Sequence, residues 1–569
     1  MGNELIVQEG ARAQLEQSPQ LVNELAAVDQ MLKRGMWSTA FDLMSGLDKR
    51  YQLDGNALES FATAAYMIGR ESTFLELLER AFETFSAGAK PTNAAGAAFW
   101  IGLTHMFRGE YGRGSGWLVR SERLVGEHGF DCVEQGYILL PRVESSLAQG
   151  DLSAADHYAS EAVRIGEQFG DEDLLALGRH LKGRIQIVSG NTPEGLSLLD
   201  ETMIATTDGR LSPIVTGLVY CSVIEICQNY QIQKRAKEWT DALTRWCGEQ
   251  PQLVAFTGRC LIHRSEILIF DGKWTEAFAE AGAACRRLLA GPVEHHAGPA
   301  YYQEGEVLRL SGRFDEADAS YRSASRLGFD PQPGLALMRL RQGKSQAALS
   351  SIKRTLASVR DPVGRMRIIP AAVEIVLAKG DAETARKLCD ELSGLAARHV
   401  SETVEAASAE AIGDLSFADG NFEVSLLNYE KAAQLWRDLH APYRLARLRL
   451  KIGQTCVALG DSEGASREIE AALDVFGKLG AEPDRKAAEA LLRSLRPGME
   501  GLLTPRQTEV LQLVAEGLTN REIAQRLRLS ERTIDRHVSD TLTRIDVPTR
   551  AAATAFAISQ GLIVLPSSG

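Results

Sequence analysis

The stretch GDLSAADHYA, Gly150–Ala159, sets the pattern for most of the chain. A glycine is followed by a polar residue and then by small residues about three positions apart. Related text begins at Gly272 (GKWTEAFAEA), Gly312 (GRFDEADASY) and Gly380 (GDAETARKLC). Glycine suits the left-handed residue that ends a helix, and a polar residue suits the start of the next one. Each copy therefore predicts a turn between two helices that pack closely through small side chains.

Copies of this phrase recur mostly at intervals of about 40 residues, which is typical of stacked helix pairs. Each pair has two apolar faces and buries both only by stacking on its neighbours. The region from Leu21 to Leu495 resembles tetratricopeptide-like solenoids, although its repeat is longer and lacks their full pattern. A generic all-α domain with coincidental glycine turns is the alternative. The remaining copies begin at Gly109, Gly190, Gly343, Gly420 and Gly460, with weaker ones at Gly35, Gly69 and, lacking the glycine, Gln231.

Composition limits the class of protein. The chain has 569 residues, too many for one compact core, and its Ala- and Leu-rich text favours helices. We find no apolar run of about 18 residues and no secretory signal, so we expect a cytoplasmic protein without a membrane-spanning helix. The net charge of −12 argues against a protein that coats nucleic acid without sequence preference. From Leu503 to Ile563, however, the sequence has eight basic and seven acidic residues, so the acidic excess lies in the rest of the chain.

Eight cysteines are scattered along the chain without a CxxC pair, and we expect buried, reduced thiols. The alternative is a redox or metal sensor built from the five cysteines from Cys221 to Cys285. Their spacing does not support a zinc site. The His295–His296 pair lacks a metal-ligand pattern. We therefore expect no metal and no cofactor.

Aromatic and histidine residues concentrate in 217–264 and 291–306, and they form a candidate ligand pocket. We expect most of them to be core and turn residues instead. The candidates are Tyr220, Tyr230, Trp239, Trp246, His263, His295, His296, Tyr301 and Tyr302.

The repeat text ends at residue 495, and RPGMEGL (496–502) indicates a linker. The following segment predicts four helices within 503–565. Thr504 and Thr519 begin two of them, each followed three residues later by Gln or Glu, as in a capping box. Leu529 and Ser530 form a turn, and Ser530 begins the third helix. Thr549 begins the fourth.

The third helix predicts a buried and an open face. Ile534, Val538, Leu542 and Ile545 recur at helical spacing and should face inward. Two short helices joined by a tight turn, the second with polar and basic residues exposed, indicate a helix-turn-helix. The residues left on the open face are Arg532, Asp535, Arg536 and Ser539.

The segment closely resembles the C-terminal DNA-binding domain of the LuxR family. The matching phrases are LTPRQTEVLQLVAEG, TNREIAQRL, SERTIDRHV and the Val547/Arg550 pair. The resemblance implies double-stranded DNA as a partner, with the third helix in the major groove. It also implies a homodimer on DNA through the last helix.

Residue roles follow from that resemblance. Arg536 would pair with guanine, and Asp535 would accept from a cytosine amine. The family often has Lys where Asp535 stands, Asn at Asp540 and Gly at Asp546, so this chain adds negative charge near DNA. The implied base-reading residues are Asp535, Arg536 and Ser539; the phosphate contacts are Thr519, Asn520, Arg521, Arg532, Thr533, His537 and Arg544; the dimer contacts are Ala551, Ala555 and Ile558.

We find no phosphate-binding loop, no phosphoreceiver text and no nucleophile elbow, and therefore no ATPase module and no enzyme machinery. The first hypothesis is a transcriptional regulator whose repeat domain, residues 1–495, receives a protein or small-molecule signal. The second is a scaffold or adaptor with a vestigial DNA-binding domain, which Asp535, Asp540 and Asp546 favour. The third is an enzyme with an unrecognised site between Cys221 and Tyr302.

Overall fold

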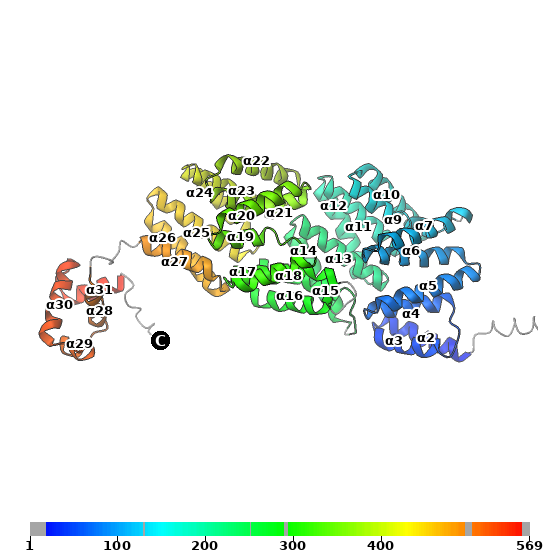
Figure 1. Ribbon diagram of the computed structural model, residues 1–569, viewed down its shortest axis with the longest axis horizontal. Coiled ribbons are helices and arrows are strands. Elements are labelled where there is room, and N and C mark those ends of the chain that lie inside the picture. The colour runs from blue at the N-terminus through cyan, green and yellow to red at the C-terminus, as the bar shows by residue number, and fades with distance from the viewer. Residues whose placement is uncertain (1–18, 129–130, 251, 290–293, 496–502, 560–569) are drawn as a thin grey trace, which may run out of the picture. The chain divides into compact units, whose positions relative to one another are not determined.

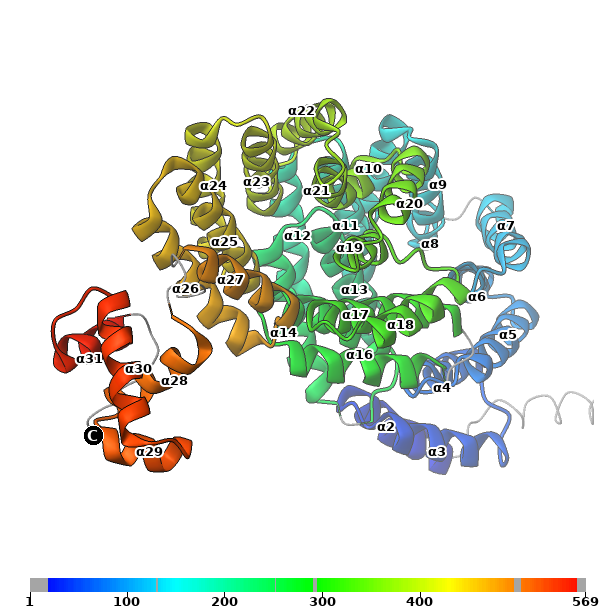
Figure 2. The same cartoon turned by 60° about the vertical axis from the view of Figure 1, so that its left-hand side comes forward.

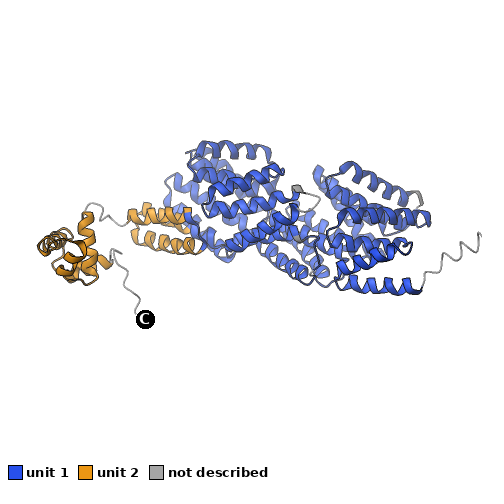
Figure 3. Cartoon of the chain, turned by 60° about the horizontal axis from the view of Figure 1, so that its bottom comes forward, with its two compact units in different colours: residues 1–448, 479–482 blue, residues 449–478, 483–569 orange. Residues whose placement is uncertain are grey.

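The computed structural model describes residues 19–128, 131–250, 252–289, 294–495 and 503–559. Its secondary structure in these ranges consists of α-helices and one short 3-10 helix, η1 (Glu294–Ala297). The predicted linker at 496–502, the chain before residue 19 and the last six residues of the predicted C-terminal domain lie outside the described residues. Two compact units divide the chain, residues 1–448 with 479–482 and residues 449–478 with 483–569 (Figure 3).

The first unit is a series of tetratricopeptide-like helical hairpins in which consecutive helices pack side by side (Figure 1). Its helices are α2 (Pro19–Lys33), α3 (Trp37–Asp48), α4 (Gly55–Met67), α5 (Glu71–Ala87), α6 (Pro91–Phe107), α7 (Tyr111–His128), α8 (Glu134–Tyr137), α9 (Leu140–Gln149), α10 (Leu152–Phe169), α11 (Glu172–Val188), α12 (Thr192–Thr207), α13 (Pro213–Asn229), α14 (Gln233–Gly248), α15 (Thr257–Phe270), α16 (Trp274–Leu289), α17 (Gly298–Leu310), α18 (Phe314–Arg326), α19 (Gly334–Arg341), α20 (Ser345–Ser358), α21 (Pro362–Leu377), α22 (Ala382–Arg398), α23 (Glu402–Ala418), α24 (Phe422–Asp438) and the start of α25 (Pro442–Leu459).

The turn between α9 and α10 shows why the repeat phrase forms a hairpin. Gly150 has φ of 78°, in the left-handed region, and it ends α9. Asp151 then begins α10, since its carboxylate accepts from the backbone N–H of Ala154 at 3.0 Å. Ala155 and Ala159 are fully buried on the side of α10 that packs on its neighbours. The predicted hairpin is therefore confirmed at this copy.

The repeat copy without a glycine keeps the same turn. Gln231, between α13 and α14, has φ of 56°, and so a residue with a side chain occupies the left-handed position. All the glycines that begin the other copies also have positive φ. The turns between successive hairpins use the left-handed region as well, which the repeat phrase did not predict. They do so at Ala89, Gly170, Gly209, Gly328, His440 and Gly480.

Contacts in the first unit extend beyond neighbouring repeats. Trp37 Nε1 donates to Gln250 Oε1 at 3.0 Å, and the backbone N–H of Val254 donates to the carbonyl of Met67 at 2.8 Å. Further along, Ser401 Oγ donates to the carbonyl of Gln231 at 2.8 Å. A repeat array with neighbour contacts alone would lack these bonds. One large apolar core accordingly draws on residues between α6 and α15 and between α19 and α23.

The candidate aromatic pocket at 217–264 is part of this core. Tyr220, Tyr230 and His263 are buried, and the two tryptophans pack against the same cluster. Burial lowers the pKa of His263 to about 3, so the imidazole is neutral. The expectation that most of these residues are core residues is confirmed. His295 and His296 lie in η1 rather than in an irregular loop.

The cysteines of the described residues are unpaired, and all but the half-buried Cys247 are buried. Burial raises the pKa of Cys221 and Cys227 to about 12, as expected of core thiols. Cys260 differs, because a hydrogen bond from the Cys247 thiol lowers its pKa. No group of three or more metal-ligating side chains occurs in the described part of the chain.

The second unit begins within α25 and includes α26 (Ser462–Leu479) and α27 (Glu482–Leu495). Its C-terminal part has four helices that pack against one another: α28 (Pro505–Ala515), α29 (Asn520–Leu527), α30 (Glu531–Arg544) and α31 (Arg550–Ser559) (Figure 2). Throughout the described ranges, no helix combines the length and apolar character that crossing a membrane requires.

Candidate nucleic-acid interface

Helix α28 begins with the predicted capping box. Thr504 Oγ1 accepts from the backbone N–H of Gln507, and the Gln507 side chain accepts from the backbone N–H of Thr504 at 2.9 Å. Val510 and Val514 are buried on its inner face. Arg506 donates to the carbonyl of Leu527 at 3.1 Å, so the start of α28 is tied to the end of α29.

Helix α29 is short and has its own capping box, between Thr519 and Glu522. The backbone N–H of Thr519 lowers the pKa of the Glu522 carboxyl by hydrogen bonding to it. The helix ends at Leu527, and Arg528 takes φ of 54°, in the left-handed region. The turn into α30 therefore begins one residue earlier than predicted, because a non-glycine residue makes the reversal.

Helix α30 has one buried side and one exposed side. Ser530 begins it, with Oγ accepting from the backbone N–H of Thr533 at 3.2 Å. Ile534 is fully buried among residues of α28 and α29, whereas Val538 and Leu542 are half-buried. Thr541 is also buried, and its hydroxyl donates to the His537 carbonyl at 2.6 Å. The sequence pattern did not single out Thr541, because threonine is equally common on open faces.

The predicted site residues lie as follows. The base-reading candidates Asp535, Arg536 and Ser539 are exposed on α30. Among the described residues, the guanidinium groups of Arg521, Arg532 and Arg536 have no hydrogen-bond or ion-pair partner. The exposed phosphate candidates are Thr519, Arg521, Arg532 and Arg544, and the half-buried ones are Asn520, Thr533 and His537.

Some candidates are already engaged within the domain. Thr519 Oγ1 donates to Glu522 at 2.7 Å, and Thr533 Oγ1 lies 2.7 Å from Ser530 Oγ. Arg544 donates to Gln507 Oε1 at 3.3 Å. These bonds satisfy helix ends and hold α30 to α28, so they reduce the freedom of these groups to contact DNA.

Asn520 has a role that the sequence did not predict. Its Nδ2 donates to Asp535 Oδ1 at 2.6 Å, and its Oδ1 accepts from Arg550 Nη1 at 2.6 Å. Arg550 also donates to the carbonyl of Leu518, and burial lowers the pKa of its guanidinium. The amide of Asn520 therefore connects the start of α31 to the open face of α30. Only the distance between these side chains reveals the connection, since they lie 15 and 30 positions apart in sequence.

Helix α31 presents its predicted dimer residues to solvent. Thr549 begins it, with Oγ1 accepting from the backbone N–H of Ala552 at 3.1 Å. Ala553 and Ala557 are buried against α28 and the end of α30. The exposed residues of the opposite face include Ala551, Ala555 and Ile558. An exposed strip of small and apolar residues is thus available along this helix.

Comparison with known proteins agrees with this arrangement. Residues 501–557 match the family described as "Bacterial regulatory proteins, luxR family". The C-terminal segment is a LuxR-type helix-turn-helix domain. The buried Ile534 and the two capping boxes belong to this LuxR-type domain, and so does the exposed face of α30.

Curated relatives match through the same part of the chain. The transcriptional regulatory protein LiaR of Bacillus subtilis is 33% identical over 101 residues, which are 17% of this chain and 48% of that protein. The DNA-binding transcriptional activator DevR/DosR of Mycobacterium tuberculosis is 38% identical over 79 residues, 13% of this chain and 36% of that protein. The quorum sensing-dependent transcriptional regulator RpaR of Rhodopseudomonas palustris is 40% identical over 81 residues, 14% of this chain and 33% of that protein. The chain thus spans less than half the length of each.

A likeness to a solved structure covers more of the chain. The "Crystal structure of APC/C hetero-tetramer Cut9-Hcn1" aligns with 82% of this chain and 95% of that chain, at 11% identity and a TM-score of 0.34.

Proposed function

We propose that the chain is a sequence-specific DNA-binding transcriptional regulator, with the LuxR-type domain as its DNA-binding part. Helix α30 supports the proposal because it has one buried side and one exposed side. Ile534 is fully buried, and the exposed residues are Arg532, Asp535, Arg536 and Ser539. A major groove about 12 Å wide accepts one helix. A helix anchored on one side and polar on the other has the form needed for that groove.

Base reading is proposed for Asp535, Arg536 and Ser539. The unpaired guanidinium of Arg536 suits the two acceptors of guanine, whereas the Asp535 carboxylate only accepts and suits an amino group of cytosine. Ser539 lies one turn further along the same side and contributes a hydroxyl. The three side chains follow one another at intervals of one and three residues, so they reach adjacent bases.

Phosphate contacts are proposed for the residues around this face. Arg521 and Arg532 are the strongest candidates, because they are exposed and unpaired among the described residues. Such contacts position the domain without reading sequence. Thr519, Thr533, His537 and Arg544 remain candidates. Asn520 is engaged by Asp535 and Arg550, which supports a positioning role rather than a phosphate contact.

The assembly on DNA is proposed to be a homodimer through α31, with Ala551, Ala555 and Ile558 at the interface. Their exposure along one side of the helix supports this arrangement. We also propose that the repeat domain ends near residue 495 and that the DNA-binding domain begins near residue 503. The helical repeats are proposed to receive a protein or small-molecule signal. Binding of the signal would shift the population of chains that present a dimeric DNA-binding surface.

Gel shift of the full chain on promoter DNA tests the proposal. Arg536→Ala should weaken specific binding by about 1–3 kcal/mol and leave folding intact, because the side chain is exposed. Ile534→Asp should abolish binding by placing a charge in the core of the domain. Glu509→Ala is a matched control on α28, outside the proposed DNA face. Undiminished binding by both Arg536→Ala and Ile534→Asp would refute the role of α30.

An adaptor function is the second candidate. Asp535, Asp540 and Asp546 are all exposed and place three negative charges on or next to α30. A scaffold that binds protein partners through its helical repeats would tolerate weak DNA binding. Stable partners in a pull-down of the full chain, without promoter occupancy in the cell, would favour the adaptor over the regulator.

A further inference from the structure

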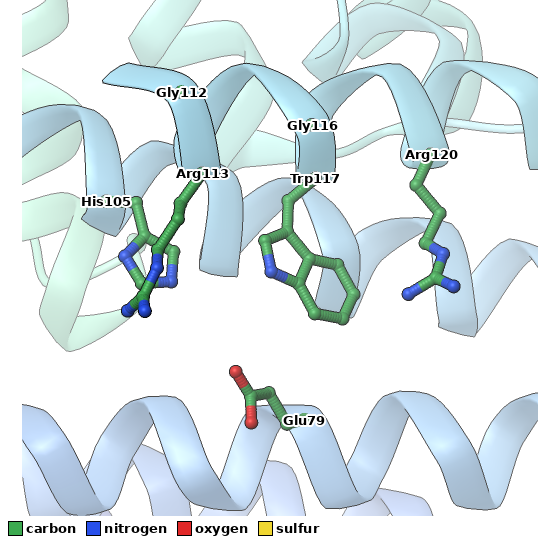
Figure 4. A pocket seen from close by; sticks show the side chains of 7 residues that line it. All are labelled: Glu79, His105, Gly112, Arg113, Gly116, Trp117 and Arg120. Carbon is green, nitrogen blue, oxygen red and sulfur yellow. The ribbon is translucent and has the colours of Figure 1, made fainter. Parts of the chain in front are cut away.

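An open cavity of about 450 Å³ lies between α5, α6 and α7 in the first helical repeats (Figure 4). Glu79 of α5 points toward it from one side, and His105 of α6 and several residues of α7 face it from the other. The lining residues from α7 are Gly112, Arg113, Gly116, Trp117 and Arg120. The cavity has the size of a small-molecule site and combines one aromatic ring with convergent polar groups.

The glycines of this cavity have no packing reason. Gly112 and Gly116 lie within α7, and a Cβ added at either would meet no atom within 4 Å. By contrast, Gly114 of the same helix lies so close to α6 that a Cβ would contact the side chain of Met106. Glycine destabilises a helix interior relative to alanine. Gly112 and Gly116 both line the cavity, and they leave the α7 side of it free of side chains at these two positions.

His105 lines the cavity with a ring nitrogen that has no partner among the described residues. The residue is only 4% exposed, yet its ring lines the cavity. Its Nδ1 lies 2.9 Å from Glu110 Oε2, and no atom of the described residues hydrogen-bonds its Nε2. Glu110 is also paired with Arg108 Nε at 3.1 Å, so its negative charge is largely compensated. The ring is almost entirely buried and lines the cavity, so its unpaired Nε2 is available to a ligand bound there.

Charges of opposite sign face each other across the cavity. The Arg120 guanidinium lies 5.1 Å from the centre of the Trp117 ring, and Trp117 packs edge-on against Phe82 of α5. Arg113 is three-quarters exposed and only loosely paired, 3.6 Å from Glu110. Glu79 is exposed, and among the described residues its carboxylate has no ion-pair partner. The site therefore offers cations along α7, an anion on α5 and an aromatic floor between them.

We propose that this cavity binds a small amphoteric molecule with a carboxylate and a protonated amine, of which free α-amino acids are the simplest members. The carboxylate pairs with Arg113. With its Nδ1–H directed at Glu110, His105 presents Nε2 as an acceptor for an N–H of the ligand. The amine pairs with Glu79. The apolar body lies along Gly112 and Gly116 against Trp117. Such a ligand is the small-molecule signal of the proposed function, but its binding is measured without DNA and so fails or succeeds separately.

Saturation-transfer NMR on the full chain, with pools of free L-amino acids at millimolar concentration, tests the proposal. At least one amino acid should bind, and its amide and its N-acetyl derivative should each bind at least about tenfold more weakly, because each lacks one charge. Glu79→Gln and Arg113→Gln should each weaken binding of the same probe by a similar factor. Both residues are exposed, so these variants should fold.

Gly116→Leu is the sharpest variant, since it fills the cavity while improving helix propensity. We expect its melting temperature to equal or exceed that of the unchanged chain, with binding lost. Gly126→Leu is the matched control, because Gly126 is an open position of the same helix outside the cavity. Its binding should be unchanged. The proposal is overturned if no amino acid binds, or if Gly116→Leu and Glu79→Gln bind the probe as tightly as the unchanged chain.

Discussion

The side-chain amide of Asn520, at the start of α29, donates to Asp535 Oδ1 on α30 at 2.6 Å. Arg550 Nη1 donates to the side-chain Oδ1 of Asn520 and so orients the amide. The amide thus presents its N–H to Asp535, and one carboxylate oxygen is held while the other stays available. In a base-reading residue, this fixed orientation reduces the entropy lost on binding.

Asn520→Ala should lower the discrimination between preferred and altered sites more than it lowers general DNA affinity. The loss of the hydrogen bond frees the Asp535 carboxylate, and the discrimination should fall by about 1 kcal/mol or more. Competition binding with duplexes that vary the base opposite Asp535 measures the change. Gln525→Ala, an exposed position of the same helix, is the control. Equal discrimination in all three proteins would contradict the positioning role.

Asp535→Lys should change the salt dependence of DNA binding. The substitution replaces a negative charge by a positive one on the exposed face of α30. If the lysine reaches a phosphate, the slope of log K against log salt should become steeper by about one unit. Affinity for unrelated DNA should rise at low salt. Asp535→Asn separates the two effects, because it removes the negative charge without adding a cation. An unchanged slope in Asp535→Lys would place residue 535 away from the phosphates.

Glycine substitutions in the repeat region should have opposite signs at two kinds of position. Gly380→Ala should lower the free energy of unfolding by about 1 kcal/mol, because φ there is 74° and alanine is strained at that angle. Gly46→Ala should raise it by a similar amount, since Gly46 is inside α3 with open space around its Cα. Urea denaturation compares the midpoints. A shift of the same sign in both variants would contradict the assigned turn geometry.

Gln231→Gly extends that test to the copy that lacks the glycine. Its φ of 56° is unfavourable for a residue with a side chain, so glycine should raise the urea midpoint. The hydrogen bond from Ser401 goes to the backbone carbonyl of residue 231 and is retained in the variant. A lower midpoint would show that the glutamine side chain itself stabilises this turn.

Acid should destabilise the repeat region through buried histidines. Burial lowers the pKa of His263 to about 3 and that of His180 to about 4, below the ordinary value of 6.5. Between pH 7 and pH 5 the unfolded chain therefore binds protons that the folded chain does not, and stability is lost as pH falls. Each histidine accounts for about 1–2 kcal/mol over this interval. His263→Gln should flatten the fall of the denaturation midpoint.

Glu59 should act in the opposite direction over the same interval. Burial raises the pKa of its carboxyl from 4.5 to about 7, so the folded chain holds this proton more tightly than the unfolded one. Its contribution is present at low pH and is lost as pH rises toward 7. Glu59→Gln should therefore steepen the acid-induced fall that His263→Gln flattens. Equal pH profiles for the two variants would contradict the burial of these groups.

The sequence by itself determined the helices and the type of C-terminal domain. Glycine positions, capping residues and apolar spacing are local properties, so they predicted the hairpin turn at Gly150 and the inward face at Ile534. They also predicted that Arg536 and Ser539 would be exposed. At Arg528 the local signal was insufficient, because a left-handed arginine cannot be recognised from residue type.

Only the tertiary structure decided which distant side chains meet. The link from Arg550 through Asn520 to Asp535 joins three helices, and the cavity at His105 and Glu79 joins three others. Likewise, the aromatic residues near Trp246 became core because the first repeats pack against the chain around residue 254. Contacts of this kind depend on how helices stack, and a periodic pattern carries no information about partners several repeats away.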